Sequence, residues 1–454
     1  MPDTLDPSDT LIDTAPLLER ARELVRLARA AGADAADVSV AASRSQGVQV
    51  RDGTIEDTGA SENDAFSLRV MVGRRAASVS ANRGGDAREL AERAVAMAKA
   101  SPENPHAGLA PGDRLARDWP ELDLADATAL ERDAMVERAL RCEAAALAVP
   151  GVTKSSGASF GRSVGGAVLA TSEGFEGAYT STRVSCSVSV IARGADAMER
   201  DYAFDSRHHL ADLRDPDAIG REAGERAAGR RDPRTVPSQS VPVLYEPRVA
   251  RGLAGHMLSA MSGTAVARGT SLFRERLGES VAASGITLVD RPHVPRGQAS
   301  RPFDGEGMAM DDLVLIEDGV LRHFLLDTAS ARELAMEPNA RGSRSGSATA
   351  PTSTNTVLKP GARAPADMLR DMGTGLLVTE LIGQGVNLVT GDYSRGASGF
   401  WIENGAIAYP VSEITIAGNL LDMLAHMEPA NDLEPHHATA APSVLVEGLT
   451  IAGR

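Results

Sequence analysis

The amino-acid sequence predicts an α+β fold, and two kinds of pattern support this prediction. Segments in which apolar and polar residues alternate are joined by short turns, which is typical of antiparallel hairpins. Helical patterns, with apolar residues three and four positions apart, do not alternate regularly with the strands as a parallel sheet requires. A chain of 454 residues is long enough for about two or three domains.

The first elements are a tail, a helix and two hairpins. Residues 1–14 are acidic and polar and predict a flexible tail. An amphipathic helix should follow the tail and end at Gly32. One hairpin is expected to turn at Asp52-Gly53, because this dipeptide is favoured in two-residue turns. A second hairpin should turn near Gly73.

Helices and strands then continue to a linker. Asp86 is a candidate N-cap for a second amphipathic helix, and a third helix is expected over roughly 126–148. Residues 152–204 alternate small and β-branched side chains and predict strands. A fourth helix is expected over 216–231. Three prolines in the segment 230–243 predict a linker, which divides the chain into an N-terminal domain, 15–232, and a C-terminal domain, 233–454.

The C-terminal domain is predicted to be rich in hairpins. Turns are expected at Asp318-Gly319 and at Asn404-Gly405, each between apolar runs. The segment 338–356 has almost no large apolar residue, so it cannot offset its own ordering entropy. We expect it to be poorly ordered in the isolated protein and to become ordered with a partner or substrate.

Composition excludes several classes of function. The net charge of −15 at pH 7 argues against nucleic acids and anionic membranes as partners, because these attract a surplus of Lys and Arg. The two cysteines, Cys142 and Cys186, are too few for a disulfide framework or a cysteine zinc site. The N-terminus lacks the basic and apolar regions of a signal peptide, and no run approaches the about 18 apolar residues of a membrane span. We therefore expect a cytoplasmic protein.

The histidines offer few candidate metal sites. His208-His209 and His436-His437 are adjacent pairs. Adjacent side chains point to opposite faces of a strand and lie about 100° apart on a helix, so neither pair is expected to chelate a metal. His256 falls on the apolar side of a predicted helix, which favours a half-buried structural role over a catalytic one.

One long stretch resembles a known family. Residues 390–424, TGDYSRGASGFWIENGAIAYPVSEITIAGNLLDML, resemble the C-terminal signature of the TldD/PmbA family, and within it the PmbA (TldE) branch. The similarity continues through 301–334 and 249–263 and, more weakly, over nearly the whole chain. The resemblance implies an N-terminal α/β domain with hairpins and amphipathic helices, and a C-terminal β-rich domain of barrel or sandwich type.

The resemblance also implies a zinc helix, H-E-x-x-x-H, in the peptidase branch of the family. When this motif is aligned with the chain, its first histidine corresponds to Arg251, its glutamate to Gly252 and its second histidine to His256. Arginine cannot bind a cation and glycine cannot act as a general base. The C-terminal cysteine of that branch has no counterpart here. We therefore expect no catalytic residue and no metal bound by this chain, and a regular α-helix at this position.

The stretch GDYSRGASG supplies the candidate substrate-binding residues Asp392, Tyr393, Ser394 and Arg395. Backbone donors and a cation occur together there, as in a loop that lines a peptide channel or reaches a partner's active site. The alternative is a glycine-rich bend between strands. We also predict that peptides bind by strand addition to 390–415, because unfolded chains are recognised through their main chain.

The resemblance implies a PmbA/TldE-like subunit of a cytoplasmic metallopeptidase complex that degrades or processes unfolded or modified peptides. Such a subunit lacks the zinc site, contributes substrate binding and chamber assembly, and is catalytic only together with a zinc-bearing TldD-type partner. The expected assembly is a heterodimer with that partner, with a homodimer as the alternative. Two other interpretations stay open: an independent hydrolase acting as a homodimer, and a scaffold without a role in proteolysis.

Overall fold

The structure is a computed structural model that describes all residues except 1–10, 83–84, 196, 347 and 454. Most of the predicted tail therefore lies outside the described residues. Ile12, near its end, is buried in the same core cluster as the first helix, so this part of the tail packs against the folded chain. No helix in the described part of the chain is long and apolar enough to cross a membrane.

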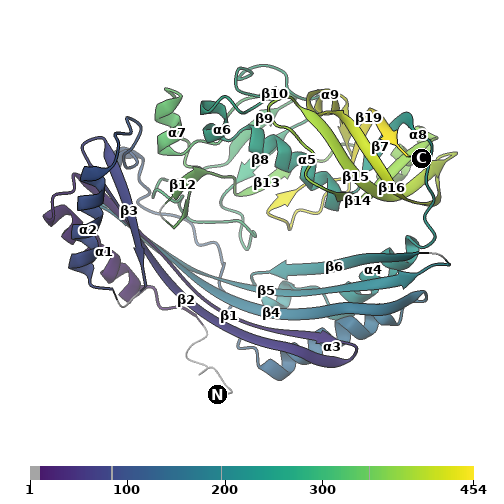
Figure 1. Ribbon diagram of the computed structural model, residues 1–454, viewed down its shortest axis with the longest axis horizontal. Coiled ribbons are helices and arrows are strands. Elements are labelled where there is room, and N and C mark those ends of the chain that lie inside the picture. The colour runs from purple at the N-terminus through teal and green to yellow at the C-terminus, as the bar shows by residue number, and fades with distance from the viewer. Residues whose placement is uncertain (1–10, 83–84, 196, 347, 454) are drawn as a thin grey trace.

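A curved six-stranded antiparallel sheet dominates the N-terminal domain, with its concave side facing the C-terminal domain (Figure 1). The spatial order β3-β2-β1-β4-β5-β6 joins two consecutive three-stranded meanders along the β1–β4 ladder, which pairs Asp37 with Thr171 and Val50 with Ala158. The strands are β1 (Ala35–Arg51), β2 (Thr54–Val72), β3 (Arg75–Ala81), β4 (Val152–Thr171), β5 (Glu176–Arg193) and β6 (Met198–Arg207).

Two pairs of helices cover the outer side of this sheet, and each pair has its own core. They are α1 (Ala15–Ala30) with α2 (Ala87–Ala100), and α3 (Arg132–Leu147) with α4 (Pro216–Gly229). The predicted N-cap is confirmed, because the Asp86 carboxylate accepts hydrogen bonds from the backbone N–H groups of Arg88 and Glu89. The third helix starts later than the predicted 126, because the Asp126 carboxylate instead accepts hydrogen bonds from Thr128 and Leu210 in an extended connection.

The C-terminal domain contains a closed five-stranded barrel, which confirms the predicted β-rich fold. Strand β7 pairs with β14, β14 with β15, β15 with β16, β16 with β19, and β19 returns to β7. Strand β17 extends this sheet by pairing with β19. The strands are β7 (Gln239–Tyr245), β14 (Gly375–Ile382), β15 (Asp392–Glu403), β16 (Ala406–Asn419), β17 (Met427–Pro429) and β19 (Val444–Ala452).

A second, smaller sheet stands beside the barrel, in the order β10-β9-β8-β13-β18, together with a separate hairpin of β11 and β12. Its strands are β8 (Leu288–Arg291), β9 (Leu313–Glu317), β10 (Val320–Leu321), β13 (Asn355–Leu358) and β18 (Thr439–Ala440); the hairpin strands are β11 (Gly342–Ser345) and β12 (Ala348–Pro351). The helices are α5 (Pro247–Ala260), α6 (Gly263–Ala267), α7 (Thr328–Glu333), α8 (Pro365–Met372) and α9 (Leu420–Ala425), and two short 3-10 turns are η2 (Gly112–Arg114) and η3 (Leu210–Asp212).

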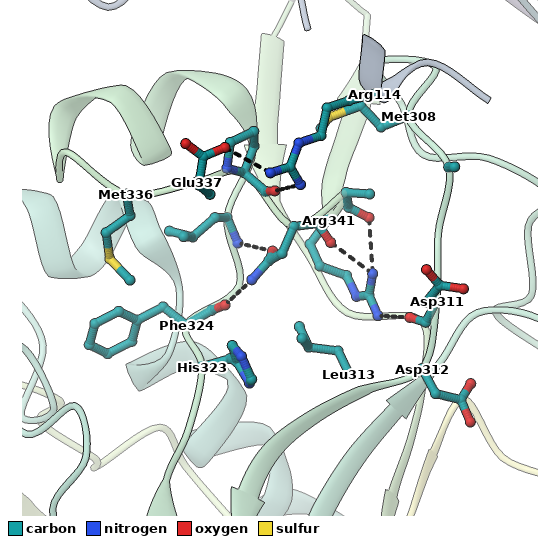
Figure 2. A pocket seen from close by; sticks show the side chains of 15 residues that line it. Arg114, Met308, Asp311, Asp312, Leu313, His323, Phe324, Met336, Glu337 and Arg341 are labelled. Atoms are coloured by element: carbon teal, nitrogen blue, oxygen red, sulfur yellow. Dashed lines mark hydrogen bonds and ion pairs between the residues drawn. The ribbon is translucent and has the colours of Figure 1, made fainter. Parts of the chain in front are cut away.

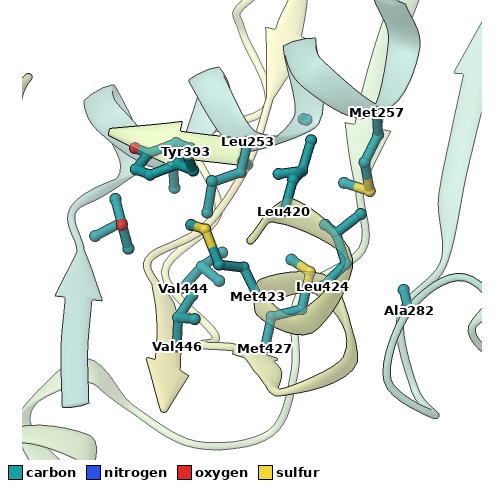
Figure 3. Close-up of a cluster of buried hydrophobic side chains, with 14 of the residues drawn as sticks. Leu253, Met257, Ala282, Tyr393, Leu420, Met423, Leu424, Met427, Val444 and Val446 are labelled. Atoms are coloured by element: carbon teal, nitrogen blue, oxygen red, sulfur yellow. The ribbon is translucent and has the colours of Figure 1, made fainter. Parts of the chain in front are cut away.

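The barrel, the smaller sheet and α5 share one continuous hydrophobic core. Figure 3 shows Leu253 and Met257 of α5 among Leu420, Met423 and the strand residues of this core. A fully buried aliphatic side chain stabilises the fold by about 1.5–3 kcal/mol. The position of α5 is therefore fixed by its apolar side.

The two domains meet through aromatic and charged contacts. Phe303 of the C-terminal domain packs edge-on against Phe175, with ring centroids 4.9 Å apart. Asp37 on β1 pairs with Arg69 of its own sheet and with Arg344 of β11, whose Nη1 lies 2.8 Å from Oδ1 of Asp37. These buried contacts hold the β11–β12 hairpin against the concave side of the large sheet.

The segment 338–356, which the sequence predicts to be poorly ordered in the isolated protein, contains regular contacts in the described residues. It includes the β11–β12 hairpin, and Arg341 within it is fully buried and pairs with Asp290 at 2.6 Å. The same carboxylate accepts hydrogen bonds from the backbone and the hydroxyl of Thr354. The expectation considered only apolar burial, whereas a buried aspartate on β8 organises this polar segment.

Candidate functional site

Helix α5 carries Arg251, Gly252 and His256, the residues that correspond to the zinc-binding positions of the peptidase branch. The helix follows β7 directly and begins after Glu246, with Pro247 in its first turn, where the absent N–H of proline is not needed. Val249, Leu253 and Met257, each four residues apart, are buried on one side of it. This spacing fixes which residues remain on the other side.

Helix α5 is α-helical from end to end, which confirms the predicted regular helix at this position. Residues five positions apart, such as Arg251 and His256, therefore point about 140° apart. The Arg251 Nε donates a hydrogen bond to the carbonyl of Pro247, and burial lowers the pKa of its guanidinium. A side chain at Gly252 would meet nothing within 4 Å, so this part of the helix faces open space.

His256 packs against Tyr393 of β15, with ring centroids 6.2 Å apart in an edge-on arrangement. Burial, and to a smaller extent the charge of Arg395, lowers the pKa of His256. The imidazole is therefore neutral at pH 7. This is the half-buried position that the sequence predicted, at a point where the barrel and α5 meet.

The four candidate substrate-binding residues alternate along β15. Tyr393 is buried, with its hydroxyl in the core near that of Tyr245, and Arg395 is half-buried on the same side of the strand. Asp392 and Ser394 are exposed on the opposite side. The structure therefore brings Tyr393 and Arg395 to His256 and directs the other two residues away from it.

Strand β15 has no free ladder for an added peptide. It pairs with β14 on one side and β16 on the other, and the backbone of Ser394 donates to Gly385. Val411 of β16 forms a backbone bridge with Arg234, which precedes β7 in the chain. Strand addition to β15 is therefore wrong, because its pairing with β14 and β16 uses the hydrogen-bonding groups of both edges. The second edge of β16 pairs at Val411 and over 415–417, so the prediction stays untested for the rest of that edge.

A pocket of about 550 Å³ lies beside the C-terminal half of α5. Gly255 and Ser259 of the helix line one side, and Thr352 and Ser353 line another. Small and hydroxyl-bearing side chains let a backbone approach closely and hydrogen-bond. This pocket is the candidate peptide site in the C-terminal domain.

Figure 2 shows a different cavity, of about 400 Å³, between the domains. Its charged residues already have partners: Arg114 pairs with Glu337 at 2.7 Å, and Arg341 donates to the carbonyl of Asp311 at 2.6 Å. The first contact joins the two domains, and the second lies within the C-terminal domain. The cavity therefore offers less to a ligand than the pocket beside α5.

The sequence of this chain matches three domain models of one family. It matches the PmbA/TldA metallopeptidase C-terminal domain over 238–453, the central domain over 119–231 and domain 1 over 36–98. The chain belongs to the PmbA/TldD metallopeptidase family. The residues matched by domain 1 include strands β1 to β3 and helix α2, and those matched by the central domain include strands β4 to β6 and helices α3 and α4.

Named relatives and solved structures agree with this membership. The chain is 37% identical to Metalloprotease PmbA of Escherichia coli O157:H7 over 93% of each sequence, and 37% identical to a Metalloprotease PmbA homolog of Haemophilus influenzae over 94% of each. A crystal structure from Bacteroides thetaiotaomicron superimposes with a TM-score of 0.90 at 27% identity, covering 98% of this chain and all of that one. The structure of TldE from Thermococcus kodakarensis has the same fold, with a TM-score of 0.86, 22% identity and coverage of 96% and 100%.

The residues of α5 do not fit the metal that a metallopeptidase family implies. Arg251 has no lone pair to offer, Gly252 has no side chain, and His256 is a single ligand. Within the described ranges, the one group of three ligand-type side chains close enough to share an ion is Glu434, His436 and His437, and His256 is not part of it. These three residues of α5 therefore do not form a metal site.

The sequence missed the group formed by Glu434, His436 and His437. The adjacent histidines were not expected to converge, because that argument assumed a strand or a helix. In the structure they lie in a turn that begins at Pro435, so neither periodicity applies. A proline directly before the pair was the available signal, because proline disfavours both regular structures.

Proposed function

We propose that this chain is the subunit of a heteromeric cytoplasmic zinc peptidase that lacks the catalytic zinc site and holds the peptide substrate. The catalytic zinc then belongs to a TldD-type partner subunit. The substrates are unfolded or modified peptides. Membership of the metallopeptidase family, together with a helix that cannot bind the metal, supports this division of roles.

A single observation carries the proposal. At the positions where the peptidase helix has its first histidine and its glutamate, this chain has Arg251, whose Nε is bonded to its own helix, and Gly252, which faces open space. Both the metal ligand and the general base are therefore missing, while the surrounding helix and core are complete.

The peptide is held beside α5 in this proposal. The pocket lined by Gly255, Ser259 and Thr352 accepts the main chain, and Arg395, next to His256, offers a cation to a carbonyl or carboxylate group. Tyr393 supports Arg395 from within the core. Asp392 and Ser394, on the outer side of β15, are proposed to contact the partner subunit instead.

Mixing experiments test the proposal. The chain alone should not cleave a fluorescent unfolded protein, whereas the chain mixed with its TldD-type partner should, and a zinc chelator should abolish the activity. Arg395→Gln should raise KM in the mixture while the complex still forms. Glu337→Gln, at an exposed ion pair far from this strand in sequence, is the matched control and should leave KM unchanged.

Two results would favour the other interpretations. Chelator-sensitive cleavage by the chain alone, lost on His256→Ala, would indicate an independent hydrolase. Failure of the chain to bind any partner with an H-E-x-x-x-H helix, with no activity in the mixture, would favour a scaffold. Size-exclusion chromatography of the isolated chain decides whether it forms a homodimer.

A further inference from the structure

The turn after α9 and β17 brings three metal-ligand side chains together. One ligand atom each from Glu434, His436 and His437 lies within 4.8 Å of the other two. The Glu434 Oε2 is 3.6 Å from the His437 Nε2, and the two imidazole centroids are 4.2 Å apart with the rings tilted by 43°. Movements of about an ångström would bring the three atoms onto one ion at the usual bond lengths of about 2.0–2.2 Å.

The backbone on both sides of this turn is anchored. The carboxylate of Asp432 accepts hydrogen bonds from the backbone and the hydroxyl of Ser443, at 2.8 and 2.7 Å. The carbonyl of Ala438 accepts from the backbone of Thr356 at 2.8 Å. The turn is therefore held at each end, and the three ligands start near their bound positions.

The chemistry of the three side chains suits a first-row transition metal. Two imidazoles and one carboxylate are a ligand set that zinc uses in proteins, with a fourth position left for water. The Glu434 side chain is 56% exposed, so an ion has a route from solvent. A neutral imidazole carries one ring nitrogen with a free lone pair, which it can offer to a metal ion.

Two arginines interact electrostatically with residues of this turn. Arg207 is paired with Asp205 at 3.0 Å, so its charge is partly compensated. Arg251 of α5 interacts electrostatically with Glu434. The positive charge of Arg251 near Glu434 would therefore disfavour a cation at this turn.

We propose that Glu434, His436 and His437 form a binding site for one divalent transition metal ion, with zinc as the natural candidate. This site is distinct from the vacant position on α5 and lies on the Arg251 side of that helix. It revises the expectation that the chain holds no metal, which rested on the helix residues and treated adjacent histidines as non-chelating.

Zinc titration of the metal-free chain, in competition with a chromophoric chelator, tests the site. We expect one saturable equivalent for the wild type. Loss of even an outer partner of a metal ligand costs about 10–100-fold in affinity, so His436→Ala and His437→Ala should each weaken binding by at least about tenfold. Glu434→Gln should also weaken it. Arg251→Gln should strengthen it, because a competing cation is removed.

Matched controls keep the result specific. His426→Ala removes another histidine of the same domain, and His256→Ala removes the imidazole on α5; both should bind zinc like the wild type. Cobalt(II) absorption typical of four-coordinate nitrogen and oxygen ligands should appear in the wild type and be lost in the His436 and His437 variants. Circular dichroism of each metal-free variant checks its fold, and His→Gln replacements substitute for any alanine variant that misfolds.

The absence of saturable zinc binding would overturn the proposal, as would equal affinity in the wild type and both histidine variants. The titration uses the chain alone and no peptidase readout. Its failure therefore leaves the proposed peptidase subunit standing, and failure of the mixing experiment leaves this site standing.

Discussion

Arg248, in the first turn of α5, lies 3.0 Å from the carboxylate of Asp201 on β6 and so ties the C-terminal core to the edge of the large sheet. Asp201 also pairs with Arg230, which follows α4, at 3.2 Å. Burial alone raises the pKa of Asp201, but the charge of Arg248 and its hydrogen bond outweigh this, so the pKa lies below its usual value. One buried carboxylate thus joins elements of both domains.

Replacing Asp201 with Asn should destabilise the protein by about 1.5–3 kcal/mol, because Arg248 and Arg230 lose the buried carboxylate that they share and retain only Glu246 and Glu380. Urea unfolding followed by circular dichroism measures this loss. Glu337→Gln, at an exposed ion pair with Arg114, is the control and should change stability by less than about 1 kcal/mol. Equal, small effects of both substitutions would mean that the Asp201 network contributes little.

Stability should also depend on pH through Asp304 and Glu306. Burial raises the pKa of Asp304 to about 6, and burial together with the Asp304 charge raises that of Glu306 to about 7. A raised carboxyl pKa contributes stability that is complete below the unfolded value of about 4 and is lost as pH rises through the folded pKa. The contribution of this pair should therefore fall between about pH 4 and pH 7.

The difference between the wild type and the double variant Asp304→Asn, Glu306→Gln isolates this contribution. Thermal unfolding at several pH values should show a wild-type midpoint that declines, relative to the double variant, from acid to neutral pH. A constant difference across that range would contradict the assigned pKa shifts.

Restoring two residues of the zinc helix should not restore catalysis. The double substitution Arg251→His, Gly252→Glu places a ligand and a base on α5, but α5 is regular and a third ligand beside His256 is still missing. We expect no chelator-sensitive cleavage by this variant alone. Gly252→Glu by itself should raise the melting temperature, because glycine costs a helix about 1 kcal/mol and the space at this position is open.

The buried carboxylate of Asp290 should control the order of the segment 338–356. It pairs with Arg341 and accepts hydrogen bonds from Thr354 and Thr356. Asp290→Ala should therefore speed hydrogen exchange of the backbone in this segment by at least about tenfold, since buried hydrogen bonds to charged groups are worth about 1.5–3 kcal/mol each. Asp318→Asn, in the β9–β10 turn, should leave the segment unchanged, and rapid exchange there already in the wild type would support the original expectation from the sequence.

Local features of the fold were predictable because short segments encode them. The turns at Asp52-Gly53 and Asn404-Gly405 form where expected, since these residues accept the positive φ angles that such turns require. The regular helix α5 and its lack of a complete ligand set also follow from residues close together in the chain. These features depend on residues that are adjacent in the sequence, so contacts between distant segments were not needed to predict them.

The tertiary structure alone decided which distant segments meet. The carboxylate of Glu143 on α3 accepts both backbone N–H groups of the Asp52-Gly53 turn, some 90 residues away, and His436 meets His437 and Glu434 because a turn anchored at Asp432 directs them together. Closure of the barrel likewise pairs both edges of β15, whose hydrogen-bonding groups the local sequence pattern suggested were free. Such contacts depend on how whole sheets and helices pack, and the free energy of that packing is spread over residues that no short stretch of sequence contains.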